Sequence, residues 1–385
     1  MNLASPPAPA AAQSVRPVVL AVGPTPPPYN GMSVATANLC ASAASHRFEL
    51  VIVDTADRRG LGNVGRLDFR NVWLALRHTA EFVYRLLSRR PDIVYVPIAQ
   101  NMLGFIRDCG FLLPARFLRV PTVIHLHGGY FKRFYATSPP HFRWLVRLAL
   151  GRTSCAIVLG EAFRDHFDGI LPNGVVRVIP NGIDDFAGAV EPPSAERIER
   201  VVVFLSTLMA TKGVFALLEA VPKVLAECDA VRFVFAGEWV SPEEEAAAMR
   251  FVAETGCTEQ VEFRPPVGPN DKHDLLRGAD VFAFPTKYPL EGHPYVIIEA
   301  MCAGLPIVTT DTGCIVETVE NGANGFIVGA DDTTALASRI LALLRDDELR
   351  ERMGACSREK YLNYYTLERW GRDICEALGS VLQRD

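Results

Sequence analysis

The sequence lacks the long apolar segments that mark membrane-spanning and secreted proteins. No run reaches 18 consecutive apolar residues, and the first 16 residues are rich in Ala and Pro, without a basic start followed by an apolar core. Neither a transmembrane helix nor a secretory signal is therefore expected. We expect residues 1–16 to form a disordered tail and the protein to be cytoplasmic.

Paired cysteines and the fingerprint of dinucleotide-binding proteins are also missing. The nine cysteines are scattered and never spaced as C-x-x-C, which favours a reducing compartment and disfavours a disulfide framework or a zinc site. Neither half carries G-x-G-x-x-G after its first expected strand, which disfavours a nicotinamide or flavin cofactor. We expect no cofactor and no metal ion.

Charge is distributed unevenly along the chain. Through Asp185 there are 20 Lys and Arg against 12 Asp and Glu, and after it 19 against 32, so the halves carry about +8 and −13. A basic first half favours contact with an anionic partner such as a lipid headgroup or a lipid-linked diphosphate. Two solvated surfaces without such a partner are the alternative. Nucleic acid is not an expected partner, because the acidic half repels phosphate backbones.

Both halves are built in the same way, from short β-branched runs that alternate with longer amphipathic stretches. The runs are apolar on both faces, as in parallel strands covered by helices on two sides. We therefore predict two Rossmann-like, doubly wound α/β domains facing each other across a cleft, at 17–186 and 196–361, with a linker at 187–195 and a helix at about 362–385 that packs back on the first domain. The expected strands are 18–22, 50–53, 93–96, 122–125, 156–159 and 176–179 in the first half, and 201–205, 232–236, 261–263, 281–284, 307–310 and 326–328 in the second.

The most informative segment runs from Glu291 to Pro306. Pro294 suits the first turn of a helix, so the free backbone N–H groups around Tyr295 and Val296 would form an anion site suited to a diphosphate. Glu299 lies little more than a turn further on and can accept two hydrogen bonds from a ribose diol. By spacing alone, two acidic residues flanking an ordinary helix are the simpler interpretation.

This segment resembles the E-x7-E signature of the retaining glycosyltransferases of family four, which have the GT-B fold. The resemblance extends from about Val18 to Trp370, and it implies that Glu291 lies by the donor sugar and that Glu299 holds the ribose. The family usually has an Arg and a Lys on the diphosphate; Lys212 fits, but Thr207 occupies the Arg position. Either the helix N-terminus carries more of the phosphate charge or another base such as Lys287 contributes.

Other pieces of the sequence fit the resemblance less specifically. Glu238 and Val267 fall where such enzymes pass loops along the donor base. Gly31 follows the first strand and would let backbone approach a phosphate or sugar, with Ser33 as a helix cap and the helix starting near Val34; a plain Pro-rich turn is the alternative.

His125 and His127 fall on one side of a strand end, as a metal pair would, but no further ligand cluster supports a metal. By resemblance, His127 lies near the donor sugar and the scissile bond, and Gly128 and Gly129 leave space for substrate. A structural role for a lone strand-end histidine is the alternative. The segment from Pro180 to Asp184 is similar to the family's domain-crossing segment.

Two segments of the first half are candidate surfaces for a membrane or a lipid-linked acceptor. Residues 69–90 combine Trp73, Phe82 and Tyr84 with five Arg, and residues 142–152 are similarly amphipathic. Such helices either lie on an anionic membrane or pack onto the sheet.

The resemblance implies transfer of a hexose from a UDP- or GDP-sugar to a saccharide or lipid-linked acceptor, in exopolysaccharide, lipopolysaccharide or glycolipid synthesis. The protein would then lie in the cytoplasm or peripherally on the inner face of the plasma membrane. A sugar-nucleotide epimerase of the same architecture and a catalytically silent nucleotide-sugar-binding partner are the alternatives.

Overall fold

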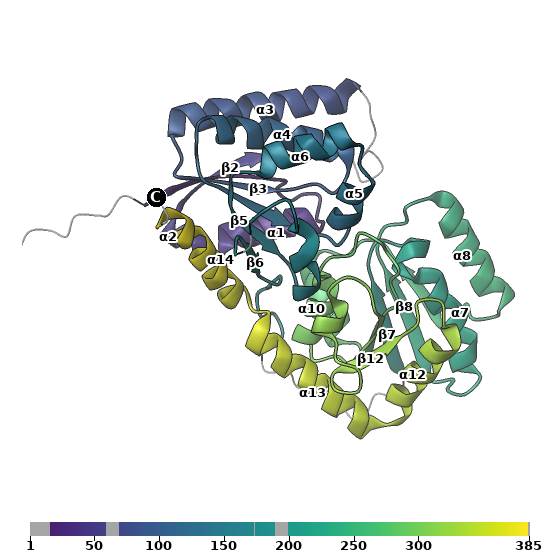
Figure 1. Ribbon diagram of the computed structural model, residues 1–385. Helices are drawn as coiled ribbons and strands as arrows, with labels where there is room; N and C mark the ends of the chain where they lie inside the picture. The colour runs from purple at the N-terminus through teal and green to yellow at the C-terminus, as the bar shows by residue number, and fades with distance from the viewer. Residues whose placement is uncertain (1–15, 59–68, 173, 189–198, 384–385) are drawn as a thin grey trace, which may run out of the picture.

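The computed structural model describes residues 16–58, 69–172, 174–188 and 199–383. It contains two parallel sheets of six strands each, one in each half of the chain (Figure 1). The expected tail at 1–16 and linker at 187–195 lie almost entirely outside the described residues. None of the described helices combines the length and apolarity needed to cross a membrane.

The first sheet has the strand order β2-β1-β3-β4-β5-β6. Its order reverses at β1, which pairs with both β2 and β3. The elements of this half are β1 (Val18–Gly23), α1 (Gly31–Ala41), α2 (Ala44–Arg47), β2 (Glu49–Asp54), α3 (Phe69–Arg89), β3 (Ile93–Pro97), α4 (Met102–Phe117), β4 (Thr122–Leu126), α5 (Phe131–Thr137), α6 (Pro140–Leu150), β5 (Thr153–Val158), the 3₁₀ segment η2 (Glu161–Phe167) and β6 (Val176–Val178).

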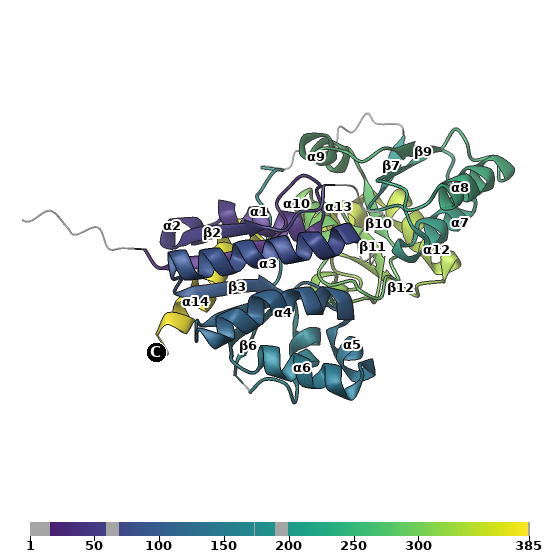
Figure 2. The same ribbon diagram turned by 90° about the horizontal axis from the view of Figure 1, so that it is seen from above.

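The apolar runs of this sheet are explained by two hydrophobic cores, one on each face. In β1, Leu20 and Val22 enter one core, whereas Val19 and Ala21 enter the other. Successive side chains of a strand point to opposite faces, so a strand buried on both faces needs apolar residues throughout. Figure 2 shows α3 and α4 together on one side of the sheet.

The second sheet has the order β12-β11-β10-β7-β8-β9. Its strands and the helices around them form a single large hydrophobic core. Here too the order reverses at a central strand, because β7 pairs with β10 and β8. Its elements are β7 (Arg200–Leu205), η3 (Ala210–Lys212), α7 (Val214–Leu225), β8 (Val231–Ala236), α8 (Pro242–Glu254), β9 (Val261–Arg264), α9 (Pro269–Arg277), β10 (Val281–Phe284), α10 (Tyr295–Cys302), β11 (Ile307–Thr310), α11 (Ile315–Thr318), β12 (Gly325–Val328), α12 (Thr333–Arg345) and α13 (Asp347–Tyr364).

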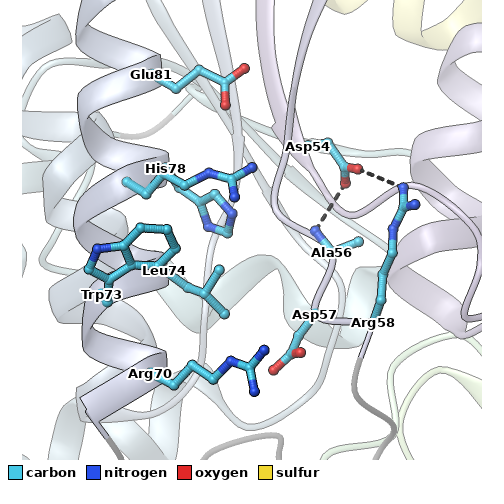
Figure 3. A pocket seen from close by; sticks show the side chains of 10 residues that line it. Asp54, Ala56, Asp57, Arg58, Arg70, Trp73, Leu74, His78 and Glu81 are labelled. Carbon is cyan, nitrogen blue, oxygen red and sulfur yellow. Dashed lines mark hydrogen bonds and ion pairs between the residues drawn. The ribbon is translucent and has the colours of Figure 1, made fainter.

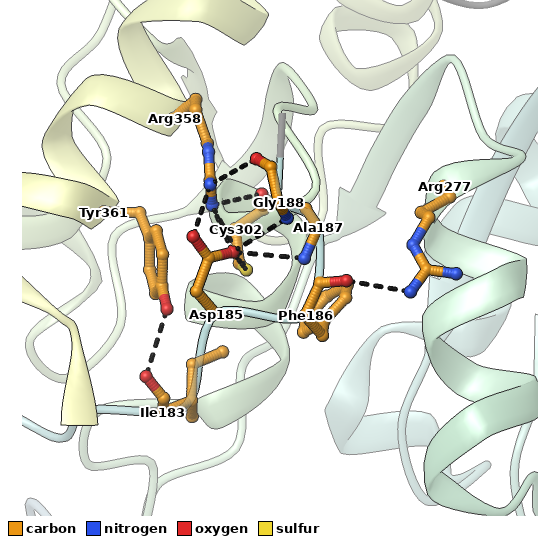
Figure 4. Close-up of polar contacts among 9 residues, drawn as sticks. All are labelled: Ile183, Asp185, Phe186, Ala187, Gly188, Arg277, Cys302, Arg358 and Tyr361. Atoms are coloured by element: carbon orange, nitrogen blue, oxygen red, sulfur yellow. Dashed lines mark hydrogen bonds and ion pairs between the residues drawn. The ribbon is translucent and has the colours of Figure 1, made fainter. Parts of the chain in front are cut away.

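The last helix, α14 (Leu367–Leu382), packs on the first sheet, where Trp370, Ile374 and Leu378 are buried with residues of β1, β3 and β5. The chain thus passes twice between the halves, and the two passages pair with each other at Ile183 and Thr366. Figure 4 shows the first passage held to the second half by Arg358, which forms an ion pair with Asp185 at 2.6 Å.

The predicted fold class is confirmed, and each of the twelve expected strands corresponds to an observed strand. The observed start and cap of helix α1 differ from the prediction. It begins at Gly31 rather than near Val34, and its cap is Asn30, whose side chain accepts hydrogen bonds from the amides of Met32 and Ser33 (both 3.0 Å). Ser33 instead sits in the first turn and completes the capping box.

Candidate functional site

Glu291 and Lys212 come together at the carboxyl ends of two neighbouring strands of the second sheet. Lys212 ends the short η3 segment after β7, and Glu291 lies in the loop between β10 and α10. The Lys212 ammonium donates to Glu291 Oε2 at 2.7 Å, and the Thr286 hydroxyl donates to the same oxygen at 3.1 Å. Because Glu291 is only 8% exposed, this pairing offsets the cost of burying its carboxylate.

Glu299, on α10, is buried in a similar pairing that sequence reasoning missed. Lys272, in the first turn of α9, donates to Glu299 Oε1. The other carboxylate oxygen, Oε2, is shielded from solvent and has no hydrogen-bond partner among the described residues. A buried acceptor without a donor is costly, and a ligand hydroxyl is the kind of donor that would satisfy it.

The anion site predicted from the sequence falls at the first turn of α10. Tyr295 and Val296 are its first two residues, and the first amides of a helix have no partner within the helix. Glu291 precedes this turn and Glu299 follows it on the same helix, so each Lys–Glu pair includes a residue close to this helix end.

His127 directly follows β4 and stacks on His125, with ring centroids 3.9 Å apart. His125 Nδ1 lies 2.5 Å from the Tyr95 hydroxyl, while Nε2 of each histidine is shielded from solvent without a partner among the described residues. Burial lowers the pKa of His127 to about 4, so the ring is neutral near pH 7. It can exchange hydrogen bonds with a ligand but supplies no positive charge.

The loop of Glu291 touches the strand end of His127. A Cβ on Gly292 would overlap the His127 carbonyl oxygen, and one on Gly129 would lie 2.7 Å from the Glu291 carbonyl oxygen. Only glycine permits this approach. The structure therefore brings the backbone segments of the two predicted catalytic residues into contact. Gly128 and Gly129 lie against the second half rather than beside an open space, which corrects the expectation for them.

The structure places the remaining candidates around this centre. Gly31 opens α1, and a Cβ there would meet no atom within 4 Å. Glu238 follows β8 and accepts a backbone hydrogen bond from Leu208 at 2.8 Å, while Val267 packs partly buried between β9 and α9. Lys287 is paired at 2.6 Å with Asp331, not with Glu291 or Glu299. Among the described residues no cluster of three or more potential metal ligands occurs.

No sequence signal identified Lys272, because it lies 27 residues before Glu299 in an ordinary polar helix. The contact exists because α9 packs beside α10. Another contact that no sequence pattern indicated lies between the two halves, where the Asn181 amide donates to His293 Nδ1 at 3.0 Å.

Two family descriptions match most of the chain between them. Residues 29–185 match "Glycosyltransferase Family 4", and residues 192–360 match "Glycosyl transferases group 1".

Curated relatives match with moderate identity. The phosphatidyl-myo-inositol mannosyltransferase of Mycobacterium leprae is 33% identical over 48% of this chain and 49% of its own length. The GDP-mannose:cellobiosyl-diphosphopolyprenol alpha-mannosyltransferase of Xanthomonas campestris is 25% identical over 82% of this chain and 84% of its own. The chain spans about half the length of the first relatives it matches.

Solved structures match over nearly the whole chain. Anabaena HepE, in complex with UDP and glucose, has a TM-score of 0.73 at 19% identity, covering 95% of this chain and all of the other. A glycosyltransferase from Rickettsia africae has a TM-score of 0.76 at 16% identity, covering 96% of this chain and all of the other. These similarities describe the same two-domain fold.

Proposed function

The chain belongs to glycosyltransferase family four, and from this premise we propose that it transfers a hexose from a UDP- or GDP-sugar to a saccharide or lipid-linked acceptor, with retention of anomeric configuration. The observation that carries the proposal is the meeting of Glu291, Lys212 and His127 beside the first turn of α10. A relative named for GDP-mannose and a neighbour named for UDP support both donor bases.

In the proposed donor complex, the diphosphate lies at the first turn of α10. The amides of Tyr295 and Val296 and the Lys212 ammonium stabilise the negative charge that develops as the nucleotide leaves. Glu299 accepts the ribose hydroxyls, one of which would satisfy its unpartnered Oε2. The backbone near Glu238 and Val267 borders the base, and Gly31 borders the diphosphate or sugar from the first domain.

Glu291 and His127 orient the reacting groups. Lys212 holds one oxygen of Glu291, so the carboxylate has a fixed direction before the donor arrives. A neutral His127 donates a hydrogen bond to the donor sugar without adding charge beside the oxocarbenium-like carbon. Closure of the two domains around the substrates excludes water from the transfer.

We further propose that the protein works peripherally on the cytoplasmic face of the plasma membrane, in polysaccharide or glycolipid synthesis. Helix α3 packs on the sheet through a narrow stripe that includes Phe82 and Leu86, and it exposes large apolar residues on its outer face. Phe69, Trp73 and Leu76 are 88%, 53% and 65% exposed. Segment 142–152 offers less apolar surface to a membrane, because Phe142 and Val146 of α6 are buried.

The proposal is tested by incubating the purified chain with a panel of UDP- and GDP-sugars and a membrane lipid extract, and measuring released nucleotide. We expect release that needs one donor and the extract, and that falls at least a hundredfold in Glu291→Gln. Isomerisation of the donor without extract would instead identify an epimerase, and donor binding without any turnover would identify a silent binding protein.

Fixed cations and helix amides, rather than a metal ion, stabilise the leaving group in this proposal. Activity is therefore expected to persist in excess EDTA, measured as initial rates of nucleotide release. A loss of rate that added Mg²⁺ or Mn²⁺ restores would contradict this part of the proposal.

A further inference from the structure

A cleft of about 590 Å³ opens away from the donor site, between the end of β2 and the first half of α3 (Figure 3). It lies at the same edge of the sheet as the other loops that follow strands, where ligands bind in open parallel sheets. Its described lining residues include three arginines, Arg58, Arg70 and Arg77, and an exposed tryptophan, Trp73.

The acidic residues of the cleft are largely engaged with partners other than Arg70 and Arg77. Asp54 accepts hydrogen bonds from the amides of Thr25 and Ala56, both at 3.0 Å, and from Arg58 at 3.4 Å.

Glu81 forms an ion pair with Arg85 at 2.7 Å, and Asp57 faces Arg70 in Figure 3. Within the part of the chain that the structure describes, neither Arg70 nor Arg77 forms an ion pair. Two guanidinium groups are therefore available to an anion, which they recognise through paired N–H donors.

The cleft also offers an aromatic surface beside these cations. The Arg77 guanidinium lies 5.9 Å from the centre of the Trp73 ring, and 53% of the Trp73 side chain is exposed. An exposed indole provides a flat apolar face for a sugar ring. The cleft therefore combines cationic groups that can bind an anion with an aromatic face that can pack against a sugar ring.

The distance of the cleft from His127 limits the size of such a ligand. The cleft follows β2, and His127 follows β4, with β1 and β3 between them in the sheet. Three strand spacings amount to about 14 Å. A molecule that reaches from the cleft to the reacting hydroxyl must therefore be longer than a single sugar.

We propose that this cleft binds the acceptor through a phosphate or diphosphate group held by Arg70 and Arg77, with the adjoining sugar against Trp73. The inference rests on the proposed function, because it names the acceptor class as an oligosaccharide carrying an anionic phosphate. The apolar residues that α3 exposes beside the cleft favour a lipid on the far side of the phosphate.

The test measures binding of α-glucose 1-phosphate to the full chain by calorimetry, with UDP at saturation to occupy the donor site. Glucose without phosphate is the ligand control. We expect the double variant Arg70→Gln, Arg77→Gln to weaken binding about tenfold or more, because charge-assisted hydrogen bonds are lost. Arg89→Gln removes a charge from the same helix away from the cleft, and we expect it to bind as the parent does.

A second arm identifies the source of the phosphate, using phosphatidylcholine vesicles with and without a polyprenyl-diphosphate-linked disaccharide. Capture only by loaded vesicles, lost in the double variant, supports a lipid-linked acceptor; binding of the soluble phosphate alone supports a free phosphorylated saccharide.

The proposal is overturned if glucose 1-phosphate fails to bind or binds no better than glucose. It is also overturned if Arg89→Gln weakens the binding of glucose 1-phosphate as much as the double variant does. UDP binding is a separate readout. If UDP fails to bind while glucose 1-phosphate binds as expected, the assignment of the donor site is wrong and the assignment of the cleft still holds.

Discussion

At the residue scale, each glutamate of the signature is paired with a lysine. Lys212 holds Glu291 and Lys272 holds Glu299, although the two lysines come from different elements. Burying a carboxylate without a partner is costly, so both pairs stabilise the site before any ligand arrives. Thr207 occupies the position at which the family usually has an Arg, so we expect Lys272 to supply the second cation for the diphosphate.

Replacement of Lys272 by Met is expected to weaken UDP binding about tenfold and uridine binding much less, because the lost charge acts on the diphosphate. Titration calorimetry with both ligands measures the difference. Adding Thr207→Arg to this variant is expected to restore part of the affinity. Lys223→Met, which removes a lysine that donates to the hydroxyls of Thr333 and Thr334, is the control. Equal weakening of UDP and uridine would show that Lys272 acts only through Glu299.

A substitution at Gly31 tests whether this residue contacts a ligand, and it is not expected to disturb folding. Because an added Cβ would meet no atom of the protein, Gly31→Ala is expected to leave the melting temperature nearly unchanged. If backbone at Gly31 approaches the donor, the KM for the donor rises severalfold in the same variant. An unchanged KM would make this segment an ordinary turn.

At the element scale, the start of α7 depends on one glycine. Gly213 has φ +92°, and a Cβ there would overlap the carbonyl oxygen of Pro285. This close approach places Lys212 next to the loop after β10. The glycine therefore links the start of a helix to the geometry of the Lys212–Glu291 pair.

We expect Gly213→Ala to lower the free energy of unfolding by about 3 kcal/mol, the sum of a left-handed backbone and a backbone clash. Gly322→Ala is the matched control, since Gly322 has φ +87° with no atom near an added Cβ. That variant is expected to lose only about 1 kcal/mol. Urea denaturation of both variants separates the two contributions, and equal losses would contradict the clash.

At the scale of the whole molecule, the two halves meet through the carboxyl-terminal loops of both sheets. His293 Nδ1 accepts from the Asn181 amide at 3.0 Å, and its Nε2 lies 2.9 Å from the Thr318 hydroxyl. The Glu317 carboxylate accepts from the amides of Glu161 and Ala162. These contacts tie loops of the second sheet to the strand ends of the first sheet.

The His293 contact predicts acid sensitivity. Burial lowers the pKa of His293 to about 3, so the unfolded chain binds a proton more readily than the folded chain. The contribution of His293 to stability is complete above its pKa in the unfolded chain, about 6.5. It is lost progressively as pH falls toward its pKa in the folded chain. Between pH 7 and pH 5 we expect this residue to account for about 2 kcal/mol of lost stability. Urea denaturation of the parent and of His293→Gln measures it, and equal pH dependence in both would refute the role.

The fold class and the position of the signature could be predicted from the amino-acid sequence alone. Apolar runs such as 18–22 identify strands because a parallel strand is buried on both faces, and Gly, Pro and Glu spacing identifies α10 because helix ends need particular residues. These signals are local, so they are readable along the chain.

Only the tertiary structure decided which side chains meet. The Lys272–Glu299 pair, the contact of Gly292 with His127, and the cleft beside Arg70 join segments that no local pattern relates. The start of α1 was also decided by Asn30 and the packing around it, rather than by Ser33 as the sequence suggested. Such contacts depend on which strands are neighbours in the sheets and on how the two halves dock, and both are set by the packing of the whole chain.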